Sequence, residues 1–328
     1  MRTNLVNNVL YFLRLKLLNF LLSDNSPRFN MQVMILILIL GFVSIETIGA
    51  ISRKDKGSRI KDRYKNNSNT AKSNPCKNEE NDSPTNCFCN PDIQVGNATR
   101  IECWVFGKNL TKDYGTWSSF INQPRIEEMQ IVVRPNGFFN FIPTTALEYL
   151  GKLKMIDIKY GSIDEIHPYA FANLTQLHDI KLMRNQIVTL SNHAIAHLPN
   201  LTELNLDENR ISELRRDVFV DLPNLQKFYI TQNNLSVLQE GAFKHLTHLL
   251  ELELSNNYVS VLTKDTFNGL SELKKLDLNN NTIRMLGDLT FAELWVLEVS
   301  LFVLFNKALD ESHAYKITHK YRTVDESI

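Results

Sequence analysis

The stretch "LTELNLDENRISELRRDVFVDLPN", residues 201–224, has leucines at its positions 1, 4, 6, 14 and 22. This spacing matches neither the period of a helix, about three to four residues, nor the alternation of a simple strand. The same register recurs every 24 residues in six copies, which start at Leu153, Leu177, Leu201, Leu225, Leu249 and Leu273. The chain therefore contains a tandem repeat, and the repeat predicts the fold.

Each recurring position has a physical reason. Leu204 and Leu206 are two residues apart and predict a short strand with both side chains on one face. Asn209 stands where the chain leaves that strand, so its carboxamide can pair with buried backbone groups in the turn. One copy buries about seven apolar side chains, worth roughly 10–20 kcal/mol, while ordering its backbone costs about 1–2 kcal/mol per residue. A single copy therefore cannot fold alone, whereas stacked copies that share a core can.

The repeat, with its LxxLxL segment, its Asn column and its later Phe and Leu columns, resembles the extracellular leucine-rich-repeat family in its 24-residue form. The resemblance covers residues 126–296, about seven copies, of which the first is looser and has Arg134 in the Asn position. Gly161 is a second departure from the Asn column. The family implies an α/β solenoid: a horseshoe with a parallel concave sheet, an irregular or short-helix convex side and a disulfide-bonded N-terminal cap. Insect cell-surface proteins such as connectin, chaoptin, Slit and the Toll ectodomains are similar.

The four cysteines all precede the repeats, at Cys76, Cys87, Cys89 and Cys103. An even number grouped at the end of a repeat array predicts two disulfides, for which three pairings are possible. A metal site would need a Cys-x-x-Cys pair or nearby histidines, and neither occurs among them. The Cys-x-Cys spacing also resembles the cap of secreted leucine-rich-repeat proteins, and we assign residues 76–125 to such a cap.

Three segments precede the cap. Residues 31–50 contain an apolar run from Val33 to Val43 that is shorter than the ~20 residues needed to span a bilayer. This run predicts a signal peptide, with an uncleaved membrane anchor as the alternative, and makes residues 1–30 an upstream extension before Met31. Residues 51–75 hold eight Lys or Arg against two Asp. They predict a disordered basic linker, either a solvated spacer or a contact for heparan sulfate or another acidic partner.

The carboxyl-terminal segment, residues 297–328, begins as a degenerate eighth repeat and ends in a polar tail without a second cysteine cap. It is either an improvised cap over the open edge of the repeats or, as we prefer, the mark of a truncated form of a longer protein. Eight Asn-x-Ser/Thr sequons agree with export. The candidates for glycosylation are Asn66, Asn81, Asn97, Asn109, Asn173, Asn200, Asn234 and Asn280.

Catalytic and cofactor motifs are absent from the sequence: it has no Gly-x-Ser-x-Gly, phosphate-binding loop or dinucleotide fingerprint. His193 and His197 lie four residues apart, but no Glu follows His193 as a metalloprotease helix requires. We therefore expect a non-enzymatic protein without a cofactor or a metal. Lys plus Arg and Asp plus Glu number 36 each, which argues against nucleic-acid binding.

The side chains beside the buried leucines of each strand should point to the concave face. Six strands at about 4.8 Å spacing would make a face roughly 24 Å along the stack, which suits a protein partner better than a metabolite. Tyr229 should be the strongest contact, because a ring on a rigid strand offers large area at little entropy cost. The alternative is that the charges only keep this face soluble. The predicted partner-binding residues are Asp179, Lys181, Glu203, Asn205, Asp207, Lys227, Tyr229, Glu251 and Glu253.

The sequence thus predicts a secreted or cell-surface protein that binds an extracellular protein ligand or receptor, in adhesion, guidance or ligand reception. Homophilic contact is one form this could take, and membrane contact is expected only if a longer form carries an anchor. An innate-immune receptor for a microbial glycan or lipid is an alternative, which would need a pocket or clustered aromatic residues where only Tyr229 is expected. A protein inhibitor of an enzyme is a second alternative.

Overall fold

The computed structural model describes residues 74–76, 83–91, 96–108 and 110–297. The predicted upstream extension, the signal peptide, nearly all of the basic linker and the tail after Leu297 lie outside this part of the chain. Three of the sequons also lie outside it, those of Asn66, Asn81 and Asn109.

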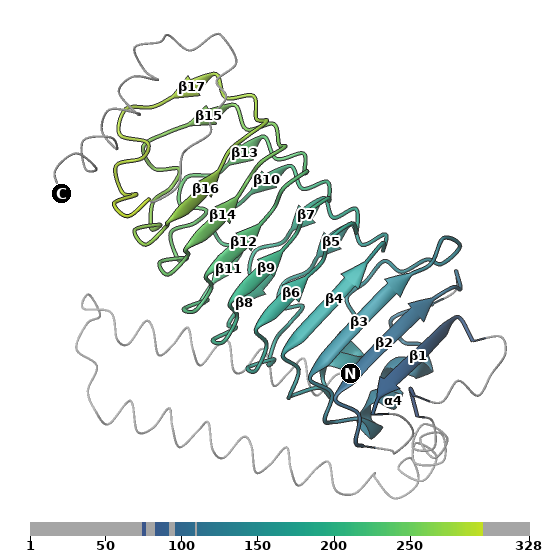
Figure 1. Ribbon diagram of the computed structural model, residues 1–328. Coiled ribbons are helices and arrows are strands. Elements are labelled where there is room, and N and C mark those ends of the chain that lie inside the picture. Colours follow the sequence, from purple (N-terminus) through teal and green to yellow (C-terminus); the bar gives the residue numbers. More distant parts are fainter. Residues whose placement is uncertain (1–73, 77–82, 92–95, 109, 298–328) are drawn as a thin grey trace, which may run out of the picture. The chain divides into compact units, whose positions relative to one another are not determined.

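One nine-stranded sheet runs through the whole repeat array (Figure 1). Eight of its strands are parallel, and neighbouring repeats pair in register, so that Leu204, Phe228 and Leu252 lie side by side. The parallel sheet is confirmed, but six strands was too few, because the first repeat and the cap extend the sheet. The strands are β1 (Thr85–Asn90), β2 (Arg100–Val105), β3 (Glu128–Val133), β4 (Met155–Lys159), β6 (Asp179–Lys181), β9 (Glu203–Asn205), β12 (Lys227–Tyr229), β14 (Glu251–Glu253) and β16 (Lys275–Asp277).

The rest of each turn is built from very short elements. Two-residue strands pair as β5–β7, β8–β11, β10–β13 and β15–β17, and the helical segments are α4 (Gly115–Ser119), η2 (Phe120–Asn122) and α5 (Thr144–Leu147). None of the helices in the described ranges is long and apolar enough to cross a membrane. The short strands are β5 (Glu165–Ile166), β7 (Thr189–Leu190), β8 (Ile195–Ala196), β10 (Glu213–Leu214), β11 (Phe219–Val220), β13 (Val237–Leu238), β15 (Val261–Leu262) and β17 (Met285–Leu286).

The recurring apolar columns form one continuous core. The leucines that face away from the sheet surface are buried in every copy. Behind them, the ring of Phe267 stacks between those of Phe243 and Phe291, with centroids 6.4 and 5.7 Å apart. Each copy therefore supplies a wall that its neighbour lacks, as the stacking argument requires.

The asparagine column joins each repeat to the one before it. Asn209 is 7% exposed, and its Oδ1 accepts hydrogen bonds from the backbone N–H groups of Asn185 and Ile187 at 2.9 and 3.0 Å. Its Nδ2 donates to the carbonyl oxygens of Leu182 and Leu206 at 2.8 and 2.9 Å. One side chain thus satisfies backbone groups of two turns, which confirms the role predicted for this column.

The asparagine column also explains why residue 161 is a glycine. Its N–H donates to Asn185 Oδ1 at 2.9 Å. A Cβ atom at position 161 would lie 2.6 Å from that oxygen and 3.0 Å from the carbonyl oxygen of Phe139. Only glycine therefore lets Asn185 reach the backbone at the start of the regular repeats.

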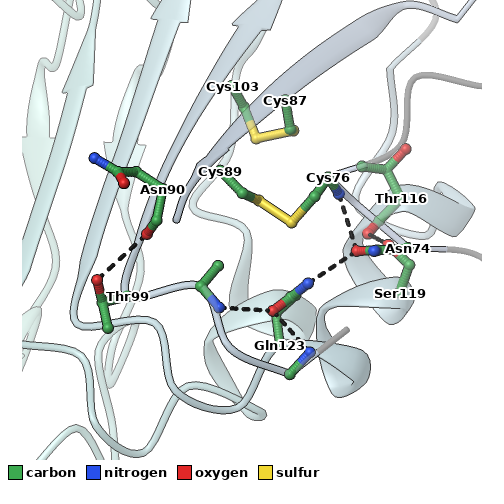
Figure 2. Close-up of a disulfide and its surroundings, with 12 residues drawn as sticks. Asn74, Cys76, Cys87, Cys89, Asn90, Thr99, Cys103, Thr116, Ser119 and Gln123 are labelled. Carbon is green, nitrogen blue, oxygen red and sulfur yellow. Dashed lines mark hydrogen bonds between the residues drawn. A yellow bond between two sulfur atoms is a disulfide. The ribbon is translucent and has the colours of Figure 1, made fainter. Parts of the chain in front are cut away.

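Two disulfides hold the cap together (Figure 2). They join Cys76 to Cys89 and Cys87 to Cys103, which selects one of the three pairings that the sequence left open. Cys87 and Cys103 are also register partners in the antiparallel pair of β1 and β2. The cap therefore closes the first edge of the parallel sheet with a cross-linked hairpin.

A buried glutamine supports the cap beneath the disulfides. Gln123 Oε1 accepts from the N–H groups of Gly96 and Ala98 at 3.1 and 3.3 Å, and its Nε2 donates to Asn74 Oδ1 at 3.0 Å (Figure 2). Asn74 and Pro75 are themselves buried. The buried part of the cap therefore includes Asn74, two residues before the first cysteine.

Replacing a ladder asparagine should destabilise the array. Asn233→Ala removes the acceptor for Ile211 N–H and the donor to the Leu206 and Ile230 carbonyls. Leaving these buried groups unpaired should lower the free energy of unfolding by about 2–4 kcal/mol. Urea unfolding followed by circular dichroism measures the loss. Gln226→Ala, at an exposed position of the same repeat, is the control, and an equal loss in both variants would refute the role of the column.

Candidate functional site

The outward side chains of the nine-stranded sheet form a surface that we call the sheet face. It corresponds to the predicted concave face, and all nine predicted partner-binding residues lie on it. Lys227 is exposed and the other eight are half-buried. The register places them in rows across the strands: one row contains Asp179, Glu203, Lys227 and Glu251, the next contains Lys181, Asn205, Tyr229 and Glu253, and Asp207 follows beyond Asn205.

Several charges on the sheet face are paired with one another. Lys181 Nζ lies 3.3 Å from Glu203 Oε1. Lys275, which the sequence reading did not single out, contacts Glu251 and lies 2.9 Å from Glu253 Oε1. The hydrogen bonds that Lys275 donates to these two carboxylates raise its pKa. One lysine shared by two carboxylates leaves net negative charge at the β14–β16 end of the sheet face.

Tyr229 is tied to the same cluster. Its hydroxyl donates to Glu251 Oε2 at 3.1 Å, and burial together with this carboxylate raises the pKa of Tyr229. Burial alone would raise the pKa of Glu251, but hydrogen bonds from Lys275 and Tyr229 outweigh it and lower that pKa. The ring is half-buried rather than exposed, so it offers a partner less area than the sequence suggested.

Asp179 and Asp207 differ from these paired residues in their electrostatic surroundings. Burial raises the pKa of both carboxyl groups, against the opposing charge of Lys181 for Asp179 and the hydrogen bond from Thr231 for Asp207. Asp207 Oδ1 accepts from the Thr231 N–H at 2.6 Å. Within the described part of the chain, neither carboxylate forms an ion pair. Their surroundings therefore compensate these two negative charges only in part, without a direct ion pair.

Asp157 also lies in an outward position but is only 6% exposed. Its Oδ2 lies 2.8 Å from Lys159 Nζ and accepts a hydrogen bond from Gln130 Nε2 at 3.3 Å. Its Oδ1 is buried and has no hydrogen-bond partner. The burial was not predictable from β4 alone, because Gln130 comes from the neighbouring strand β3.

An aromatic cluster occupies the cap end of the sheet face, where the sequence analysis expected none. The rings of Phe88 and Trp104 have centroids 5.2 Å apart, and those of Trp104 and Phe106 are 6.3 Å apart. The Arg134 guanidinium lies 4.8 Å from the centroid of the Trp104 ring. The expectation that Tyr229 is the only aromatic residue on this face is therefore wrong. Alternation along β2, with Cys103 and Val105 buried, was the signal that would have placed Trp104 outward.

The paired histidines are surface residues and do not form a helical metal motif. His193 and His197 flank the two-residue strand β8, and the Tyr169 ring lies 5.4 and 6.1 Å from their rings. His197 Nδ1 is 3.0 Å from Asp221 Oδ2. No group of three or more His, Cys, Asp or Glu side chains in the described ranges could hold a metal ion.

Comparison with known proteins is consistent with this architecture. A family model described as "Leucine rich repeat" matches residues 151–211, 175–235, 199–259, 223–283 and 247–299. Connectin of Drosophila melanogaster is 38% identical over 104 residues, which are 32% of this chain and only 15% of that protein.

Two solved structures are also similar. One is a crystal structure of TLR13 in complex with ssRNA13, with a TM-score of 0.45 and 23% identity over 58% of this chain and 33% of that chain. The other is the Toll–Spatzle complex of Drosophila, with a TM-score of 0.42 and 17% identity over 59% of this chain and 34% of that chain.

The charge of Asp179 should cost folding stability at neutral pH. Because burial raises the pKa of this carboxyl group, the folded state favours its protonated form, and that stabilisation is lost as pH rises through the folded-state pKa. Asp179→Asn should therefore raise the free energy of unfolding at pH 7, by less than about 1 kcal/mol. The difference should vanish once the pH falls below about 3.9, where the unfolded carboxyl group is protonated as well.

Denaturant unfolding at pH 3 and pH 7 measures this difference. Asp164→Asn, at an exposed position away from the sheet face, is the matched control. A destabilised Asp179→Asn variant at pH 7 would contradict the assignment.

Proposed function

Because residues 151–299 belong to the leucine-rich repeat family, we propose that the chain binds another extracellular protein through its sheet face, in adhesion, guidance or ligand reception. Nine strands at about 4.8 Å spacing give this face a length of roughly 38 Å. That length suits an interface with a folded partner better than a small-molecule pocket.

The observation that carries the proposal is that Asp179 and Asp207, on a rigid surface, have no direct ion pair within the described part of the chain. Carboxylates that lose hydration without gaining an ion pair lower the stability of the fold. A cationic partner would offset this desolvation penalty. The backbone of the inner strands is already paired on both sides. Recognition at the centre of the face must therefore come from side chains rather than from strand addition.

Secretion or display at the cell surface is part of the proposal. Two disulfides need an oxidising compartment to form and persist. Asn97, Asn173 and Asn234 are exposed and accessible to glycosylation. Asn200 and Asn280 are poorer acceptors, because their Nδ2 atoms donate to the Thr175 carbonyl at 2.7 Å and to Asn256 Oδ1 at 2.9 Å.

A second candidate function is recognition of a microbial glycan by an innate-immune receptor. The specific observation in its favour is the cluster of Phe88, Trp104 and Phe106, since exposed aromatic faces are suited to stacking against flat, partly apolar ligands. The half-buried carboxylates at the centre of the face would have no role in that case.

Charge reversal tests the proposed face. The triple variant Glu203→Lys, Asp207→Lys and Glu251→Lys should weaken binding at least about tenfold, because it replaces attraction by repulsion at the centre of the interface. The measurement uses the purified full chain on an array of surface-displayed extracellular proteins. The control reverses three exposed carboxylates away from the face, Asp164, Asp217 and Glu240. If the first triple variant binds its partner as tightly as the unmodified chain does, this face is not the interface.

A further inference from the structure

The cap and the first repeat form a partly exposed aromatic surface, which we call the aromatic patch: Phe88, the half-buried Trp104, Phe106 and the stacked Arg134. Phe88 is 48% exposed and Phe106 is 40% exposed. Trp104 Nε1 donates to Glu102 Oε1 at 2.6 Å, so the polar edge of the indole is satisfied within β2. A partner can therefore cover the patch with an apolar group without leaving the indole N–H unpaired.

The patch and Asp179 lie in different rows of the sheet face. Trp104 pairs with Val132 and through it with Lys159, whereas the row of Asp179 runs through Met155 and Glu128 to Arg100. Three strand spacings separate β2 from β6, and four separate β2 from β9. At about 4.8 Å each, these spacings amount to about 14–19 Å across the strands, and Asp179 is offset from Trp104 by a further four residues, about 13 Å, along them, so each carboxylate is about 19–20 Å from Trp104.

On β4, β6 and β9, the outward carboxylates outnumber the outward lysines by two. The two lysines form the ion pairs Lys159–Asp157 and Lys181–Glu203. Asp179 and Asp207 remain. Beside them lies Asp157 Oδ1, buried and without a partner. A partner cannot reach this buried oxygen, but two carboxylates without an ion pair on one rigid surface favour cationic donors from outside this chain.

We propose that the sheet face recognises its protein partner at two points: an aromatic or aliphatic side chain on the aromatic patch, and lysine or arginine side chains at Asp179 and Asp207, about 19–20 Å away. This inference rests on the proposed function and adds the chemistry of the partner. The patch supplies a desolvated anchor, and the carboxylates fix orientation and reject acidic surfaces. The partner is therefore a basic protein surface with one exposed apolar residue.

Synthetic peptides test the spacing directly. An extended chain rises about 3.3 Å per residue, so about six residues bridge the two points. The probe is a peptide with Trp, a five-residue Gly/Ser spacer and the sequence Arg-Ser-Arg. Matched peptides replace Trp by Ala, replace both Arg by Glu, or shorten the spacer to one residue. Affinities for the full chain are measured by isothermal titration calorimetry at two salt concentrations.

The probe should bind at least about tenfold more tightly than each matched peptide. Trp104→Ala should reduce its affinity to that of the Ala peptide, and Asp179→Asn with Asp207→Asn should remove most of the salt dependence. Phe88→Ser is a second variant of the patch, in case Trp104→Ala disturbs the cap. Tyr258→Ala, at a 58% exposed position outside the strands of the sheet, should change nothing.

Three outcomes overturn the inference: no binding of the probe up to millimolar concentration, equal binding of the Glu peptide, or unchanged affinity in both patch variants. Binding of an oligosaccharide such as chitohexaose at Trp104, in place of the peptide, would do so as well and would favour the glycan-binding alternative. On the protein array, a partner lost on charge reversal but retained by Trp104→Ala would leave the proposed function intact and overturn only the two-point inference. A partner insensitive to both would refute the proposed function too.

Discussion

The contact on which the structure depends is the buried carboxamide that completes the backbone of two neighbouring turns. A tight turn inside a solenoid leaves N–H and carbonyl groups that water cannot reach, and each would cost about 1–3 kcal/mol unpaired. Asn209, Asn233 and Asn257 satisfy groups of their own turn and of the turn before it. This bond fixes the repeat length, because a longer or shorter turn would move the side chain out of reach. A fixed repeat length in turn puts every outward side chain in register with its neighbours.

The register between neighbouring strands determines which outward side chains lie next to one another on the sheet face. Residues 24 positions apart become nearest neighbours across strands, so the sequence at one outward column reads directly as a row on the sheet face. Many of the charges in those rows form ion pairs with one another, as Lys275 does with Glu251 and Glu253. Asp179 and Asp207 do not, and burial raises the pKa of both. Such local destabilisation persists where the rest of the fold is rigid enough to bear it, and it is characteristic of interaction sites.

The repeated sequence pattern made the repeats predictable, whereas the cap and the side-chain contacts between strands follow no repeated pattern and could not be placed in the same way. Six copies of one pattern place the core leucines, the asparagine column and the outward residues without any knowledge of three-dimensional contacts. The cap occurs once, so no column marks Trp104 as outward, and three cysteine pairings were equivalent until β1 and β2 brought Cys87 opposite Cys103. Asp157 was placed on the correct face, but its burial depends on Gln130 from a different strand. The contact of Tyr229 with Glu251 likewise joins two repeats, and a list of outward residues does not show whether neighbours in a row will pair.

The cap also changes what the array presents to a partner. A cap that only covered the open edge of the core would need a polar outer surface, as terminal repeats usually have. Here β1 and β2 continue the rows of the sheet face and end them in Phe88 and Trp104, with Arg134 stacked on the indole. Arg134 stands where later copies have the ladder asparagine, so the first copy has exchanged a contact inside the solenoid for one on its surface. That exchange carries little structural penalty because the cross-linked hairpin already holds the edge. The disulfide-bonded end of the array is therefore the place where departures from the repeat could accumulate into a binding surface without loss of the fold.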